Sequence, residues 1–174
     1  MAFKRAKVRG PVGEAGLFEY AVGMLARRMR TERELRRLMK GMAFPGNDGE
    51  KAIDAVVARL VELKYLSDAR FAADYTRLRK DGEKFGRRRV QQDLSAKGVS
   101  PELVGAAVGV AYEGVDEVAL AREYCARKRM KQPGNEKETA RTMGRLLRAG
   151  FSAGAVFKVL REWGVAVEEF EVEE

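Results

Sequence analysis

Arginine and lysine side chains cluster at three points along this 174-residue sequence, and their chemistry suits the binding of anionic groups. We call these clusters the basic nodes; they comprise residues 27–40, residues 77–89, and residues 127–131 with the arginines at 141, 145 and 148. A guanidinium group is planar and always charged, so it can hold a phosphate or a carboxylate through two parallel hydrogen bonds. Any single arginine could belong to a solvated helix face. Three equivalent nodes instead favour a polyanionic or filamentous partner.

The sequence lacks most of the residues that enzymes use for catalysis. It contains no histidine and one cysteine, Cys125, which excludes Ser-His-Asp triads and Cys-His pairs. The same counts exclude a structural zinc site and a disulfide framework, and they are typical of the reducing cytosol. No phosphate-binding glycine loop is present, and the acidic residues show no metal-ligand spacing. We therefore expect a cytoplasmic protein that is not an enzyme, has no cofactor or metal, and keeps Cys125 as a buried thiol.

The net charge of +8 is unevenly distributed. Residues 1–13 form a basic arm with four cationic side chains and no acidic one, whereas residues 167–174 form an acidic tail with five glutamates and no base. Outside the tail, the 34 basic residues stand against the 26 acidic ones less these five, a net charge of +13. No apolar run is long enough for a signal sequence or a membrane span, so we expect no membrane contact.

The nodes must be positioned by helices, because almost the whole sequence has helical periodicity and predicts an all-α fold. Apolar residues recur at i, i+3, i+4 and i+7 in residues 18–25, 53–60 and 156–163. Ser100 before Pro101 is typical of a helix start, and Gly98 and Gly150 stand where left-handed helix ends are expected. Residues 47–49 predict a turn. Aromatic residues expected in the core, and not stacked on bases, are Tyr20, Tyr65, Phe71, Tyr75 and Tyr124.

Internal repetition divides the helices into three units. A Leu-x3-Gly-apolar-Ser pattern occurs at residues 94–100 and again, 52 positions later, at residues 146–152. In the weaker first copy, 55 positions earlier, Phe44 corresponds to Val99 and Ala43 replaces the turn glycine. We predict three tandem three-helix, helix-turn-helix-like repeats that form an elongated, curved array, with a basic node where the first helix of each repeat meets the second. The predicted repeats are residues 14–66, 67–114 and 115–166.

Two neighbouring segments in the middle of the chain form an unusual combination. Residues 65–68 read Tyr-Leu-Ser-Asp, and residues 85–90 read Phe-Gly-Arg-Arg-Arg-Val at the start of a predicted helix. This combination resembles the RecX family, bacterial regulators of the recombinase RecA. Residues 25–35 and 146–152 also fit the family, so the likeness spans nearly the whole chain.

The resemblance implies a protein that lies in the groove of the RecA–DNA filament, bridges neighbouring protomers, and inhibits RecA ATPase, strand exchange and coprotease activities. Such a protein acts as a negative modulator of DNA recombination, DNA repair and the SOS response. We accordingly expect a monomer whose partner is the RecA nucleoprotein filament, with single- or double-stranded DNA as a further ligand of the basic nodes. The residues expected to face the filament are Arg33, Arg36, Arg37, Lys84, Arg87, Arg88, Arg89, Arg127, Lys128 and Arg129.

Two other classes of function stay open at this point. A helix-turn-helix-type module acting directly on DNA or RNA would also carry basic helices, and it would bind naked nucleic acid with a steep salt dependence. An enzyme such as a nucleotide hydrolase would have to use scattered acidic residues, and the missing motifs make it the weakest of the three readings.

The acidic tail is expected to compete with nucleic acid for the basic nodes, because unscreened charges interact over longer distances at low salt. Deleting residues 167–174 should therefore raise the affinity for naked single-stranded DNA severalfold at low salt, as measured by fluorescence anisotropy. A full-length variant with the five tail glutamates changed to glutamine is the control for charge and should behave like the deletion. Unchanged affinity in both proteins would remove this role for the tail.

Overall fold

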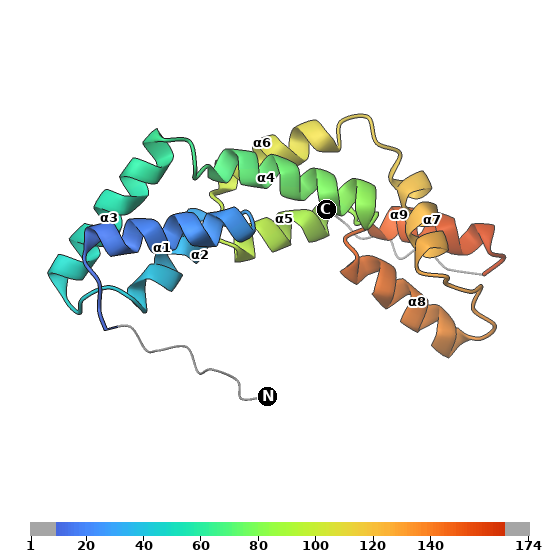
Figure 1. Ribbon diagram of the computed structural model, residues 1–174. Coiled ribbons are helices and arrows are strands. Elements are labelled where there is room, and N and C mark those ends of the chain that lie inside the picture. The colour runs from blue at the N-terminus through green and yellow to red at the C-terminus, as the bar shows by residue number, and fades with distance from the viewer. Residues whose placement is uncertain (1–9, 166–174) are drawn as a thin grey trace, which may run out of the picture. The chain divides into compact units, whose positions relative to one another are not determined.

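The computed structural model describes residues 10–165, and helices account for most of that range (Figure 1). Within those residues the β pairing consists of one isolated bridge, in which the Val12 N–H donates to the Met42 carbonyl at 2.8 Å. The predicted all-α class is confirmed. Residues 1–9 of the basic arm and the acidic tail lie outside the described residues. The helices are α1 (Glu14–Arg27), α2 (Glu32–Lys40), α3 (Asn47–Glu62), α4 (Asp68–Arg77), α5 (Arg87–Ala96), α6 (Pro101–Ala111), α7 (Glu117–Arg127), α8 (Glu136–Arg148) and α9 (Ala153–Glu162).

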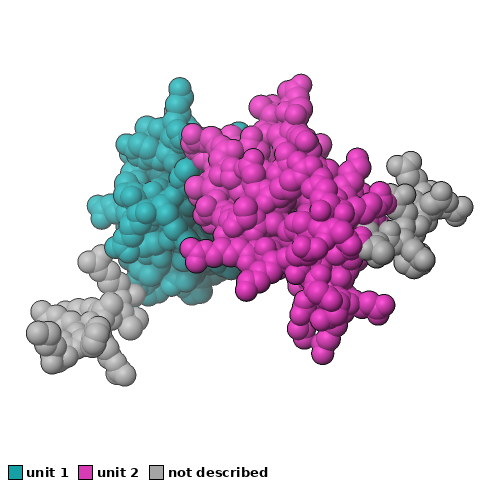
Figure 2. All heavy atoms as spheres, turned by 90° about the vertical axis from the view of Figure 1, so that its right-hand side faces the viewer, with its two compact units in different colours: residues 1–71, 97–99 teal, residues 72–96, 100–174 magenta. Residues whose placement is uncertain are grey.

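These helices belong to two compact units. Unit 1 runs to Phe71 and includes Lys97–Val99, and unit 2 contains Ala72–Ala96 and the chain from Ser100 onwards (Figure 2). The boundary falls inside α4, so the first predicted repeat lies in unit 1, the third lies in unit 2, and the second contributes to both. Between residues 10 and 165, no helix is long and apolar enough to cross a membrane.

Unit 1 is built from α1, α2 and α3 around one apolar core. The buried helix residues are spaced three or four positions apart, which places them on one face of each helix, and Leu66 joins them from the segment between α3 and α4. The helix residues are Leu17, Ala21, Leu35, Met39, Ile53, Val56, Val57 and Leu60. The first turn of α2 is capped twice, because Thr31 Oγ1 accepts from the Glu34 N–H at 3.2 Å and Asp68 Oδ1 accepts from the Glu32 N–H at 2.8 Å. Both bonds satisfy amides that the helix itself leaves unpaired.

The start of α3 differs from the sequence prediction. The turn expected at residues 47–49 is wrong, because α3 already begins at Asn47, and the reversal is made one residue earlier by Gly46 with φ of +84°. The acidic side chains of Asp48 and Glu50 lie in the first turn, where their negative charge is attracted to the positive end of the helix dipole. Phe44 is 51% exposed, whereas Val99 is buried, so the two positions matched by the repeat pattern differ in burial. Of the inserted residues, 45 and 46 precede α3 and 47–49 form its first turn, so this connection differs from the other two.

The aromatic residues are only partly where the apolar pattern placed them. Phe71 and Tyr124 are buried as expected, and Tyr20 and Tyr75 are half-buried. Tyr65 is 55% exposed, which corrects the prediction. It follows Lys64, which has a left-handed φ of +58° at the end of α3 and turns the chain so that the next side chain leaves the core.

Unit 2 has a core of α7, α8 and α9, and α5 packs on α6 through Val90, Leu94, Val104 and Val108. The core contains Leu120, Ala121, Tyr124, Cys125, Leu146, Ala149, Phe151, Val156, Val159 and Leu160. Cys125 is 3% exposed, which confirms the buried thiol, and burial raises the pKa of that thiol.

Two glycines bring the start of α5 against the turn between α8 and α9. The Gly86 N–H donates to the Ala149 carbonyl at 2.9 Å, and the Arg88 N–H donates to the Gly150 carbonyl at 3.3 Å. A Cβ at Gly86 would overlap the backbone of Gly150, and a Cβ at Gly150 would overlap that of Arg89. Gly150 also has φ of +94°, and Gly98 has +85°, as predicted for left-handed helix ends.

We expect Gly150→Ala to destabilise unit 2 by about 3 kcal/mol, because it combines left-handed strain with a backbone overlap that no side-chain movement relieves. Thermal unfolding followed by circular dichroism should show a midpoint lower by roughly 6–12 °C. Gly154→Ala is the control, since its Cβ would meet nothing within 4 Å, and it should unfold at or slightly above the wild-type temperature. Equal midpoints for the two variants would contradict the close approach.

Candidate partner-binding site

The second and third basic nodes meet around one aromatic ring in unit 2. After α4 the chain makes a π-helical turn (Leu78–Gly82), and Lys84 takes a left-handed φ of +60° before Phe85. This path turns the Phe85 ring toward Tyr124 of α7, with 6.0 Å between the ring centroids. We call the resulting group the Phe85 cluster; it comprises Phe85, the cations Arg79, Arg89 and Lys128, and the acids Glu83 and Asp93.

Three cations surround the Phe85 ring at similar distances. From the ring centroid, Arg79 Cζ lies at 5.9 Å, Arg89 Cζ at 5.8 Å and Lys128 Nζ at 6.0 Å. Arg79 also lies 4.9 Å from the Tyr75 ring. The negative face of an aromatic ring attracts cations by about 0.5–1 kcal/mol at partly exposed sites. The ring therefore helps to hold like charges together that would otherwise repel one another.

Two carboxylates complete the charge balance of the Phe85 cluster. Glu83 accepts from Lys128 Nζ at 3.0 Å and lies 3.9 Å from Arg127, while Asp93 lies 3.0 Å from Arg89 and accepts from the Tyr75 hydroxyl at 3.2 Å. The hydrogen bond and charge of Lys128, followed by the charges of Arg127 and Arg79, lower the pKa of Glu83. Glu83 of the second predicted repeat thereby pairs with cations of the third, whereas Asp93 pairs with a cation of its own repeat.

The first node lies in unit 1, where the start of α2 is tied to residues 97–99. Thr31 Oγ1 donates to the Lys97 carbonyl at 2.8 Å, and Lys97 Nζ lies 2.9 Å from Glu34. Burial by itself would raise the pKa of Glu34. The hydrogen bond from Lys97, the positive charges of Lys97 and Arg28, and the hydrogen bond from the Thr31 amide outweigh burial, so the pKa is lowered. This framework holds the helix from which Arg33, Arg36 and Arg37 project.

Six of the ten predicted site residues make interactions within the protein. Arg36 donates to Glu32 at 2.7 Å and to Asp54 at 2.5 Å, and these hydrogen bonds, with Asp54 contributing most, raise its pKa. Lys84 pairs with Glu123 at 2.7 Å. The side chain of Arg33 packs against Gly98. The remaining three form the ion pairs described above: Arg89, Arg127 and Lys128.

The remaining four predicted residues are exposed arginines. Arg37, Arg87, Arg88 and Arg129 have no ion pair with any residue between 10 and 165. Arg37 belongs to α2 of unit 1, Arg87 and Arg88 to the first turn of α5, and Arg129 to the left-handed end of α7, with φ of +49°. Their guanidinium groups are therefore the ones most available to an anionic partner.

Sequence reasoning missed the residues that organise this site. Glu83, Phe85 and Asp93 are not among the ten predicted site residues, although Phe85 is part of the segment that carries the family resemblance. The useful signal was Phe85 itself, an aromatic residue between Lys84 and Gly86 that no helical periodicity explains. Contacts between α7 and the turn after α4 cannot be read from spacing, because 43 positions separate Phe85 from Lys128.

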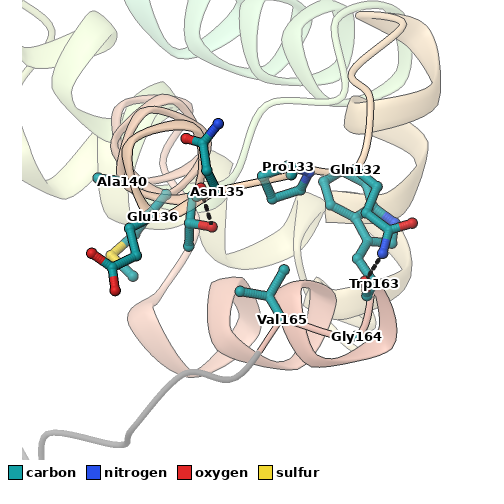
Figure 3. Close-up of a pocket in the computed structure, with 11 residues that line it drawn as sticks. Gln132, Pro133, Asn135, Glu136, Ala140, Trp163, Gly164 and Val165 are labelled. Atoms are coloured by element: carbon teal, nitrogen blue, oxygen red, sulfur yellow. Dashed lines mark hydrogen bonds between the residues drawn. The ribbon is translucent and has the colours of Figure 1, made fainter.

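A separate hollow of about 500 Å³ lies between α8 and α9 and carries no basic node residue. Pro133, Met143, Trp163 and Val165 line it, and the Gln132 side-chain amide donates to the Trp163 carbonyl (Figure 3). Among residues 10–165, no group of three or more histidine, cysteine, aspartate or glutamate residues could hold a metal ion.

The fold and the site together define an all-helical repeat protein that presents arginines from three-helix units. Family models agree with this class: RecX, first three-helix domain, matches residues 18–60, and RecX, second three-helix domain, matches residues 67–108. The chain belongs to the RecX family.

Individual relatives cover most of the chain. The regulatory protein RecX of Chromobacterium violaceum is 32% identical over 140 residues, which is 80% of this chain and 86% of the relative. The regulatory protein RecX of Myxococcus xanthus is 32% identical over 175 residues, 90% and 92% of the two chains. The crystal structure of RecX from Lactobacillus salivarius shares the fold, with a TM-score of 0.65, 20% identity, and coverage of 87% of this chain and 96% of that one.

Replacing Glu83 should weaken the Phe85 cluster in a pH-dependent way. Because folding lowers the pKa of Glu83, the folded state binds fewer protons, so its stabilising effect is complete above the unfolded pKa and lost as the pH falls through the folded pKa. We expect Glu83→Gln to lower the unfolding midpoint by about 2 °C at pH 7, and the difference from wild type to shrink as the pH falls below the ordinary glutamate pKa of about 4.3.

Glu113→Gln is the matched control for Glu83→Gln, since Glu113 is exposed and forms no ion pair within the described range. Its difference from wild type should be near zero across the same pH series. A Glu83→Gln difference that persists unchanged at pH 3 would mean that the carboxylate charge does not stabilise the cluster.

Proposed function

We propose that this protein is a non-enzymatic regulator of RecA that binds the RecA–DNA filament in its groove and inhibits RecA ATPase, strand exchange and coprotease activities. Such a protein would act in the cytoplasm as a negative modulator of recombination, repair and the SOS response. The relatives are named regulatory protein RecX, which supports a regulatory role. The ten predicted basic residues would face the filament.

The observation that carries this proposal is that the cations fall into two groups, one held by neighbouring side chains and one exposed. Arg36, Lys84, Arg89 and Lys128 are held by acidic or aromatic neighbours, whereas Arg37, Arg87, Arg88 and Arg129 stand exposed. Fixed cations beside exposed ones provide a preorganised positive surface, which lowers the cost of binding an anionic partner.

Exposed arginines occur in both units, which suits a partner that offers repeated sites. A filament presents the same acidic surface and the same phosphates at regular intervals, so contacts made by both units would add as in a multivalent ligand. Direct binding to naked DNA is the alternative, and it would use the same arginines as phosphate contacts.

Charge reversal at Arg37 and Arg129 tests the regulatory proposal with one substitution in each unit. We expect Arg37→Glu/Arg129→Glu to raise the concentration needed for half-inhibition of RecA's single-stranded-DNA-dependent ATPase at least tenfold, which corresponds to about 1.4 kcal/mol of binding free energy. The wild-type titration is followed in parallel by electron microscopy of filament length.

Lys51→Glu/Lys158→Glu changes the net charge by the same amount at exposed positions outside the nodes and is the matched control. It should inhibit as the wild type does. Absence of ATPase inhibition by wild-type protein, together with tight, strongly salt-dependent binding to naked DNA, would favour the direct nucleic-acid module instead.

A further inference from the structure

A small hollow in unit 2 lies directly beside two of the exposed arginines. Its volume is about 280 Å³, and it is enclosed by the first turn of α5, the segment that joins α6 to α7, the first turn of α7 and the residue before α9. We call it the Arg87–Arg88 pocket. Such a volume accommodates one apolar side chain of the size of leucine or phenylalanine.

Three of the seven residues that line this pocket contribute apolar surface. Val115 and Leu120 supply aliphatic surface, and Leu120 is 8% exposed and belongs to the unit 2 core. The Tyr112 hydroxyl donates to the Phe85 carbonyl at 2.7 Å, which fixes the tyrosine ring at one wall and joins the pocket to the Phe85 cluster. Apolar surface held open in this way gains free energy when another apolar group covers it.

The rim of the pocket is positively charged. Arg87 and Arg88 line it, both are exposed, and neither has an ion pair with a residue between 10 and 165. The α5 backbone beside them is engaged, since the Gly86 and Arg88 N–H groups donate to the α8–α9 turn. An anion at the rim would therefore be held by the two guanidinium side chains, which suit a carboxylate in a bidentate arrangement.

One carboxylate already stands in the pocket wall, and both of its oxygens are bonded to Ser152. Glu117 Oε1 accepts from the Ser152 N–H at 2.7 Å, and Oε2 accepts from the Ser152 hydroxyl at 2.6 Å. This fixed negative charge in the wall disfavours an anionic group inside the hollow, so an anion would be held at the rim by the arginines, with an apolar group inside. Tyr112 is the sole aromatic residue of the lining, which differs from the exposed aromatic platforms that hold unstacked bases.

We propose that the Arg87–Arg88 pocket binds a protein segment of the RecA filament, taking one apolar side chain into the hollow while a neighbouring carboxylate pairs with the two arginines. The inference rests on the proposed function, and it assigns this surface to the protein of the filament and not to its DNA. Apolar walls with a cationic rim match an acidic segment that carries an exposed apolar residue.

The test compares binding of the full-length chain to RecA filaments on single-stranded DNA with binding to the same DNA alone, by fluorescence anisotropy. Val115→Trp fills the hollow without changing charge, and Val110→Trp is its control, because Val110 is 78% exposed on α6 and does not line the pocket. Arg87→Gln/Arg88→Gln removes the rim charges, with Lys51→Gln/Lys158→Gln as the control for net charge. Unfolding curves establish that each variant is folded.

We expect Val115→Trp and Arg87→Gln/Arg88→Gln each to weaken filament binding about tenfold, while both controls bind as wild type does. Naked-DNA affinity should change less than twofold in Val115→Trp. The combined triple variant should bind filaments no more weakly than the weaker parent, because both changes act on one ligand segment. Since Arg87 and Arg88 lie on the surface, their variant keeps the test decisive if Val115→Trp does not fold.

Three results would overturn the proposal. Wild-type filament affinity in both pocket variants would show that nothing enters the hollow. An equal loss on naked DNA would assign the pocket to a nucleotide. Failure of the wild-type chain itself to bind filaments would contradict the proposed function and the pocket assignment with it, and that result is seen before any variant is measured.

Discussion

The backbone contact between Gly86 and Gly150 decides what the rest of unit 2 can present. Because neither residue has a Cβ, the start of α5 approaches the α8–α9 turn closely enough for two backbone hydrogen bonds. That approach fixes the direction in which α5 leaves the contact, with Arg87 and Arg88 exposed on its first turn. It also places Phe85, the residue before Gly86, against Tyr124. The partly buried ring and the exposed arginines thus depend on one close approach.

A second constraint is the mutual repulsion of cations gathered in a small volume. The protein offsets it locally, with Glu83 between Lys128 and Arg127, Asp93 beside Arg89, and the Phe85 ring facing three positive groups. Each contact is weak by itself at a partly solvated site. Together they hold long side chains that would otherwise sample many rotamers, so less conformational entropy remains to be lost when a partner binds.

The sequence pattern predicted the structure best at helix starts and ends, where local backbone geometry decides the conformation. Ser100 accepts from an N–H in the first turn of the following helix, and Gly98 and Gly150 are left-handed, because caps and helix ends depend on a few neighbouring residues. It failed where tertiary packing overrides local preference. The residues 47–49 have turn composition, yet they form the first turn of α3, where buried Gly49 packs against the Phe44 carbonyl.

The amino-acid sequence by itself determined the class of this protein: an all-helical repeat chain with basic nodes, no histidine and one cysteine, recognisable as a RecX relative from residues 65–68 and 85–90. Periodicity, caps and composition carry that information because they act over one or two helical turns. Only the tertiary structure decided which cations are tied to acids and which stand exposed, and that Arg87 and Arg88 flank an apolar hollow. Those properties depend on distances between side chains that lie tens of positions apart, and spacing along the chain does not set such distances.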